Sequence, residues 1–299
     1  MFRPARDDMK KWLCLLLYLF IAHAAISAER WAIIVGIGNY PEGSGWKSIN
    51  GDQDIGLIAP ILQSNGFAES RIITLANDDA TKRNIQNAID SLALNLRQGD
   101  IVYFHFSGHG QLITDIDGDE GDYGYDESIV PYDAKTAYDS NGYRGENHII
   151  DDELNGWLMD IRKRIGNDGK LIVVLDACHS GGGSRDEDDD DNEETIRGVR
   201  DVFKLPAPDL CSRVSRNPID WICISACRSY QSNYEYKADE GRVYGRLSFA
   251  LSTIFSPNIT IEQLENKLGL QYENMQSIHP QDPVIEYDTA FNKNYTLFQ

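Results

Sequence analysis

The sequence predicts an α/β protein in which helices flank both faces of a central, mostly parallel β-sheet of about six strands. Two observations support this prediction. Runs rich in Val, Ile and Leu recur along the chain, and stretches with helical spacing of apolar residues separate them. Strands that are apolar on both sides are typical of parallel sheets covered by helices. A length of 299 residues is sufficient to bury a sizeable core.

Five strongly apolar runs account for most of the expected sheet. They include WAIIVGIG near the start, DIVYFHF in the middle and LIVVLDA further on. A weaker segment, DPVIEY, is expected to be an edge strand. In chain order the expected strands are 31–38, 71–77, 100–106, 171–177, 221–226 and 282–287.

Helical patterns fill the intervals between these strands. Thr81 can cap a helix that runs to about Leu96, and Gly99 and Asp100 follow as a stop signal. The other helices are expected over 54–62, 151–165, 247–255 and 260–270. The alternation of strand and helix predicts that functional residues lie at the carboxyl ends of the strands.

The N-terminal segment has the pattern of a secretory signal peptide. A basic start at 9–11 precedes an apolar centre at 12–22, and small residues lead to a cleavage position after Ala28. A membrane anchor is the alternative, but the apolar centre is short for a span. No other stretch is long and apolar enough to cross a bilayer. We therefore expect a signal peptide over 1–28, an exported mature chain and one domain over 29–299.

The net charge of −19 argues against nucleic acid as a partner, because phosphate binding needs clustered Lys and Arg. It suits metal cations or basic peptides, although solubility alone also explains it. Residues 184–205 are highly charged and are expected to form a mobile, solvated loop.

The four cysteines beyond the signal peptide do not form a disulfide framework. Cys223 and Cys227 are expected on one strand, where they would lie roughly 13 Å apart, too far to bridge. A bond from Cys211 to one of them is the alternative to buried free thiols.

Two glycine-rich stretches follow expected strands and carry a histidine and a cysteine. FSGHG contains His109, and DACHSGG contains Cys178. If their strands are neighbours, the two side chains meet at one edge of the sheet. A cysteine nucleophile needs a nearby base, which His109 would supply. The N–H groups of Gly110 and Cys178 would then bind an oxyanion. The alternative is a buried cysteine and a structural histidine.

A zinc site is a further alternative, because His105, His109, Cys178 and His179 are all ligand types. His105 lies inside a strand, however, and His179 is expected to point away after the turn. No third or fourth ligand has convincing spacing.

The paired motifs FSGHG and DACHSGG resemble the caspase–metacaspase superfamily of cysteine peptidases, and metacaspases more than caspases. The resemblance extends over about 30–290 and includes GIGNYP, YGYDESIVP, IIDDEL and ICISACRSYQSNYE. It implies a caspase-like fold and a dyad of His109 and Cys178. A clostripain-type, arginine-directed enzyme would share this dyad and differ in topology.

The same resemblance implies a pocket for the residue before the scissile bond, lined by Asp54, Ser107 and Asp176. Asp52 is the alternative to Asp54, because the segment NGDQDI departs from the sequence pattern usual in the family. Two carboxylates in a cleft would attract Arg or Lys, and a guanidinium would suit them well.

Acidic residues around DIDGDEGDYGYDE predict calcium, which takes six to eight oxygen ligands. The resemblance to calcium-dependent metacaspases implies Asp126, Asp151 and Asp152 as ligands. A fourth ligand would fall where Arg185 and then Asp186 stand. The alternative for Asp151 and Asp152 is a helix N-terminus stabilised by acids. No organic cofactor is expected.

Together these features predict an exported cysteine endopeptidase that cuts after Arg or Lys. Its partners would be polypeptides with basic residues and the chain itself, because Arg185, Arg197, Arg200 and Lys204 lie in or beside the acidic loop. The alternative is a catalytically degenerate domain that binds calcium or basic partners.

Overall fold

The computed structural model describes residues 28–115, 118, 124–178, 195–199, 201–206, 220–239, 241–275, 277, 279–288 and 291–299. Residues 1–27 of the expected signal peptide lie outside this set. None of the described helices combines the length and hydropathy that a membrane crossing requires.

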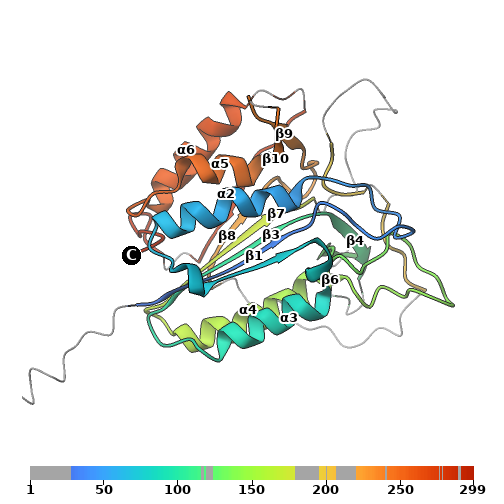
Figure 1. Cartoon of the computed structure of the whole chain (residues 1–299), viewed down its shortest axis with the longest axis horizontal. Helices are drawn as coiled ribbons and strands as arrows, with labels where there is room; N and C mark the ends of the chain where they lie inside the picture. The colour runs from blue at the N-terminus through green and yellow to red at the C-terminus, as the bar shows by residue number, and fades with distance from the viewer. Residues whose placement is uncertain are drawn as a thin grey trace, which may run out of the picture.

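A six-stranded sheet forms the centre of the molecule, in the order β11-β8-β7-β3-β1-β2 (Figure 1). All neighbouring strands are parallel except β11, which runs antiparallel to β8 at one edge. The strands are β1 (Arg30–Gly36), β2 (Ile72–Ala76), β3 (Ile101–Ser107), β7 (Lys170–Asp176), β8 (Ile222–Ser225) and β11 (Val284–Glu286). The predicted fold class is therefore confirmed, including the edge strand.

Helices cover both faces of this sheet, as Figure 1 shows. One layer contains α2 (Gly51–Ser64), α5 (Arg246–Ile254) and α6 (Ile261–Asn274), and the other contains α3 (Lys82–Ala93) and α4 (Asp151–Ile165). Alternate residues of β3 supply the two cores, because Tyr103 packs in the first and Phe104 in the second. The side chain of Thr81 caps α3, and Thr260 forms a capping box on α6.

The register of the central strands brings three carboxyl ends into line. Ser107 at the end of β3 pairs with Gly36 on β1 and with Asp176 on β7. The glycine-rich stretches that follow β3 and β7 therefore begin side by side.

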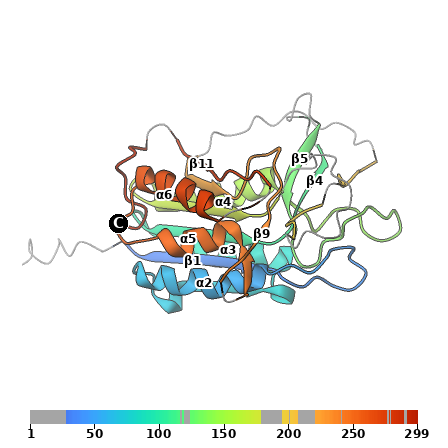
Figure 2. The ribbon, with the colours of Figure 1, turned by 90° about the horizontal axis from the view of Figure 1, so that it is seen from above.

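Two small sheets accompany the central sheet (Figures 1 and 2). One contains β4 (Gly110–Thr114), β5 (Tyr125–Ile129) and β6 (Ile149–Ile150), and the other contains β9 (Glu235–Lys237) and β10 (Val243–Gly245). The sheet with β4 lies beyond this end of the central sheet, and the sheet with β9 lies on the side of α2 and α5. The short helical turns are η1 (Glu69–Arg71) and η2 (Asn77–Asp79).

The expectation of a solvated loop over 184–205 is wrong for its second half. Residues 184–194 lie outside the described part of the chain, but Arg197 and Phe203 are fully buried. Phe203 packs edge-on against Tyr143 at 5.6 Å between ring centroids. Isolated bridges connect Gly198 to Gly110 and Phe203 to Ile113, both on β4. The basic and aromatic residues that interrupt the acidic run hold this segment against the sheet.

Candidate active site

His109 follows β3 and lies in an aromatic setting. Its ring stacks on Trp46, with centroids 4.9 Å apart, and lies 5.2 Å from Tyr40. The Nε2 atom is 2.9 Å from the carbonyl oxygen of Lys47. Because a carbonyl only accepts, Nε2 carries the proton and Nδ1 is the basic nitrogen.

The Nδ1 atom of His109 is buried and has no hydrogen-bond partner among the described residues. Burial lowers the pKa of His109 to about 4, although the bond to Lys47 opposes this shift. The imidazole is therefore neutral near pH 7, and Nδ1 can accept a proton.

Cys178 lies just beyond β7 and is 3% exposed. Its backbone N–H donates to the carbonyl oxygen of Arg197 at 2.9 Å, and the N–H of Gly110 donates to the same oxygen at 3.3 Å. Two converging N–H groups at one carbonyl oxygen are the geometry that stabilises an oxyanion. The residues proposed from sequence as oxyanion donors thus bind a carbonyl of the chain itself.

The side chain of Arg197 enters a closed acidic pocket. Its Nη1 atom is 2.8 Å from Asp54, 2.5 Å from Ser107 Oγ and 3.7 Å from Asp176. Ser107 also donates to Asp54 through a short hydrogen bond. The structure therefore gathers all three sequence-predicted pocket residues around one guanidinium. Asp52 instead contacts Asn77, so Asp54 is the residue that faces the pocket.

The two aspartates of the pocket have different electrostatic settings. Burial raises the pKa of Asp54 to about 6, while Arg197 acts to lower it. Burial also acts to raise the pKa of Asp176, but Arg197 and hydrogen bonds from Asn233 and Ser248 outweigh it and lower the pKa. Asp176 is the more firmly ionised member of the pair.

Glu235, at the start of β9, is a third carboxylate in this pocket that sequence reasoning did not single out. Its Oε1 atom accepts from Nε of Arg197 at 3.2 Å and from Nη2 at 3.0 Å. Asn50 fixes this carboxylate through its N–H and its amide group, both at 2.7 Å. Asp54 and Asp176 therefore both contact Nη1 of the guanidinium, and Glu235 contacts Nε and Nη2. The NYE portion of the family-like stretch ICISACRSYQSNYE is the sequence signal for Glu235.

The main chain around Arg197 is bound as an added strand. The N–H of Arg197 donates to the carbonyl of Asn233 at 2.9 Å, and Glu235 N–H donates to the carbonyl of Thr195 at 2.8 Å. Gly198 bridges to Gly110 on the other side. Proteins commonly bind extended peptides in this way, with backbone bonds on the edges and pockets for side chains.

Gly198 lies directly against Cys178. A Cβ atom added at Gly198 would be 2.8 Å from Cys178 Cβ and 2.9 Å from its carbonyl oxygen. Gly198, the residue after Arg197, thus packs against the Cβ and carbonyl of Cys178, and this position leaves no room for a side chain.

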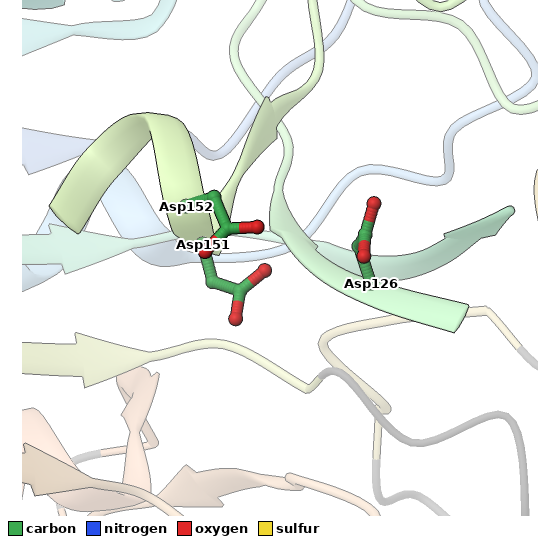
Figure 3. Close-up of side chains that lie close together, drawn as sticks. All are labelled: Asp126, Asp151 and Asp152. Carbon is green, nitrogen blue, oxygen red and sulfur yellow. The ribbon is translucent and has the colours of Figure 1, made fainter. Parts of the chain in front are cut away.

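The acidic side chains Asp126, Asp151 and Asp152 form a separate cluster. Each offers a carboxylate oxygen, and these atoms all lie within 4.8 Å of one another. Figure 3 shows Asp126 on a strand facing the two aspartates at the start of a helix. An all-oxygen set fits a hard cation such as calcium. The fourth expected ligand, Asp186, lies outside the described residues.

The candidate zinc ligands do not gather into one group within the described part of the chain. His105 is buried between Tyr103 Oη at 3.0 Å and Ser248 Oγ at 3.0 Å. Ser248 in turn donates to Asp176, so His105 is connected to the acidic pocket through Ser248. His179 lies outside the described residues.

A cysteine, a histidine and an acidic pocket thus lie together at the carboxyl ends of β3 and β7 in the α/β sheet. The sequence profile of the Caspase domain matches residues 29–286. The chain belongs to this family of peptidases.

Named relatives are metacaspases. Metacaspase-1 of Candida albicans is 25% identical over 87% of this chain and 67% of its own length. Metacaspase-1A of Aspergillus niger is 31% identical over 53% of this chain and 37% of its own length. Metacaspase-3 of Arabidopsis thaliana is 39% identical over 40% of this chain and 32% of its own length. The chain thus matches about a third of the last two proteins.

Solved structures show the same fold. Protein GSU0716 from Geobacter sulfurreducens has a TM-score of 0.61 at 20% identity, covering 90% of this chain and 98% of that one. Caspase-1 from Spodoptera frugiperda has a TM-score of 0.55 at 13% identity, covering 87% and 86%.

Proposed function

We propose that this protein is a cysteine endopeptidase that cuts polypeptides after arginine, with lysine as a weaker alternative. The observation that supports this most directly is the bound Arg197. Its side chain fills the acidic pocket, and its carbonyl oxygen accepts from Gly110 and Cys178. A substrate arginine that replaced Arg197 would present its carbonyl carbon to the thiol.

The proposed reaction assigns a role to each of the residues at the strand ends. Nδ1 of His109 takes the thiol proton of Cys178, and the thiolate adds to the substrate carbonyl. The N–H groups of Gly110 and Cys178 stabilise the oxyanion. Collapse breaks the C–N bond, and His109 returns the proton to the leaving amine. Water then hydrolyses the thioester.

Arginine is preferred over lysine because Glu235 contacts Nε and Nη2 of the guanidinium. A lysine ammonium is a single point charge. It can meet Asp54 and Asp176 deep in the pocket, but it leaves Glu235 buried without a cation. An aspartate side chain would meet three carboxylates and is excluded.

A panel of fluorogenic peptides that differ only in Arg, Lys or Asp before the reporter tests this function. The expected order of kcat/KM is Arg, then Lys, with no measurable cleavage after Asp. The Cys178→Ala protein is the control and should show none. An absence of turnover in all peptides, with and without calcium, would favour the degenerate binding domain.

We also propose that the chain processes itself at the Arg197–Gly198 bond. The proposal is supported by the Arg197 side chain in the pocket and by Gly198, the following residue, which lies against Cys178. An Arg197→Ala protein should stay uncut under conditions in which the wild type is cut. Equal fragmentation of both proteins on a denaturing gel would oppose this.

Calcium is proposed to bind Asp126, Asp151 and Asp152 and to stimulate the enzyme. When bound, the ion would offset the repulsion between these carboxylates. The cluster joins the start of α4 to β5, whose partner β4 carries Gly110. A bound ion would therefore steady the strand that supplies an oxyanion donor.

Calorimetric titration of calcium into the Cys178→Ala protein tests this site independently of turnover. An Asp126→Asn, Asp151→Asn double variant should lose the binding heat. The control is Asp160→Asn, an exposed residue of α4. Unchanged turnover of the wild type after calcium removal would contradict stimulation.

Export with cleavage after Ala28 remains a proposal from the sequence. It is supported by the backbone nitrogen of Glu29, which lies 2.9 Å from the Asp100 carboxylate. Cleavage would make this nitrogen a charged amino group beside an anion. Mass spectrometry of the protein recovered from its native producer should find Glu29 as the first residue, whereas an intact N-terminus would contradict export.

A further inference from the structure

A second thiol lies beside the candidate nucleophile. Cys227 follows the end of β8, which stops at Ser225, so the expectation that Cys227 belongs to this strand is wrong. The Ala226 N–H donates to the Leu175 carbonyl at 3.1 Å. This bond keeps the exit of β8 next to that of β7, and Cys178 follows β7.

Both thiols converge on one oxygen. The Sγ atom of Cys178 is 3.7 Å from the carbonyl oxygen of Gln231, and the Sγ atom of Cys227 is 3.3 Å from the same atom. The thiol of Cys227 is also hydrogen-bonded to Cys178, and this bond, with burial, raises the pKa of Cys227. Cys227 therefore remains protonated while its sulfur lies beside that of Cys178.

The third described thiol has a different setting. Cys223 is buried on β8, and its Sγ is 3.9 Å from Ser225 Oγ. Burial raises the pKa of Cys223 to about 12. None of these three described cysteines is in a disulfide in this structure. Cys223 supplies a matched control, because it is a buried thiol of the same strand whose Sγ contacts Ser225 on that strand.

We propose that Cys178 and Cys227 form a reversible disulfide when the protein meets a hydroperoxide, and that this bond inactivates the enzyme. The effect on activity rests on the proposed role of Cys178 as nucleophile. The formation of the bond does not, because it depends only on the placement of the two sulfurs.

The chemistry balances with hydrogen peroxide as the oxidant. The Cys178 thiolate attacks one peroxide oxygen, the O–O bond breaks, and hydroxide leaves and is protonated to water. Cys178 is thereby oxidised to a sulfenic acid. The Cys227 sulfur then displaces the sulfenic oxygen, which leaves as water with the thiol proton. Two electrons have passed from two thiols to one peroxide, and a dithiol reductant reverses the change.

Cys227 would also protect the nucleophile. Without a neighbouring thiol, a sulfenic acid is oxidised further to sulfinic acid, which ordinary thiols do not reduce. A disulfide stops the oxidation at a reversible stage. This role gives Cys227 a function in an enzyme whose proposed reaction does not use it.

The test treats wild type, Cys227→Ser and Cys223→Ala with a few equivalents of hydrogen peroxide. Free thiols are then alkylated in denaturant, and peptides are mapped without reduction. Wild type and Cys223→Ala should yield a cross-linked peptide that contains Cys178 and Cys227. Their turnover number should fall at least tenfold, and dithiothreitol should restore that turnover. Cys227→Ser should lose turnover relative to its own untreated sample, and dithiothreitol should not restore that turnover.

Absence of the cross-link in oxidised wild type, or a cross-link to Cys211 or Cys223 instead, would overturn the proposal. Full recovery of Cys227→Ser would overturn the protective role. Failure of the proposed function is recognised separately, since untreated wild type would then be inactive while the peptide map still reports the thiol pairing.

Discussion

Cys178 donates its backbone N–H to the carbonyl oxygen of Arg197 at 2.9 Å. The same arginine fills the acidic pocket with its side chain, at 0% exposure. In the proposed reaction, this carbonyl is the one that the thiol attacks. Under this proposal the intact chain holds one of its own residues in the substrate position, and another substrate would bind only after the segment 195–199 has left.

The glycine after Arg197 is expected to control self-processing. A Gly198→Ala variant should be cut at least tenfold more slowly, because the new Cβ would lie 2.8 Å from Cys178 Cβ and displace the bond from the thiol. Time courses on denaturing gels measure this rate. A Val199→Ala control should be cut at the wild-type rate, and cutting of Gly198→Ala at that same rate would contradict the close approach.

Glu235 is expected to set the preference for arginine. Glu235→Gln should lower kcat/KM for arginine peptides by about 10- to 100-fold. The reason is that the variant loses charge-assisted hydrogen bonds that contribute roughly 1.5–3 kcal/mol. Lysine peptides should be affected less, so the Arg/Lys ratio falls. Glu286→Gln, on the exposed side of β11, is the control. An unchanged ratio in Glu235→Gln would refute this role.

Turnover of arginine peptides should depend on the charge of Asp54. Burial raises its pKa to about 6 with Arg197 in place, and an empty pocket lacks the cation that acts to lower it. The pocket binds arginine best when Asp54 is ionised, so kcat/KM should be full well above this pKa and fall as the pH drops through it. The pH profile of the self-processed enzyme measures this, and Asp54→Asn should lose the step.

Trp46 is expected to orient the histidine. Its ring stacks on His109 at 4.9 Å and is itself held by the bond from Nε1 to the Ala134 carbonyl at 3.1 Å. Trp46→Ala should lower kcat by about 10- to 100-fold, because small displacements of a catalytic group are costly, with little change in KM. Trp46→Phe keeps a ring and should retain most of the activity. Equal losses in both variants would argue against stacking as the cause.

The central sheet was predictable because most of its strands are continuous apolar runs, and such runs between helical segments indicate buried parallel strands. The small strands β4, β9 and β10 were not, since they contain three to five residues each and mix polar with apolar side chains. Their pairing depends on the strand ends that they cover, which no local pattern encodes.

Ser107 and Asp176 were expected at the candidate site because the family resemblance implied them, and both stand at strand ends in the structure. Arg197 was expected as one of several basic residues in a solvated loop at which the chain would cut itself, and its burial was not expected. Its burial follows from three carboxylates that come from distant segments, and local charge patterning favours solvent for such a run. A basic residue followed by glycine within an acidic stretch was the only local signal.

The most direct test of the central claim is the N-terminal sequence of the C-terminal fragment produced by the purified wild-type protein. The account predicts that this fragment begins at Gly198 and that the Cys178→Ala protein yields none. A fragment that begins elsewhere, or the same fragment from Cys178→Ala, would contradict the claim that Arg197 is held as the substrate of Cys178.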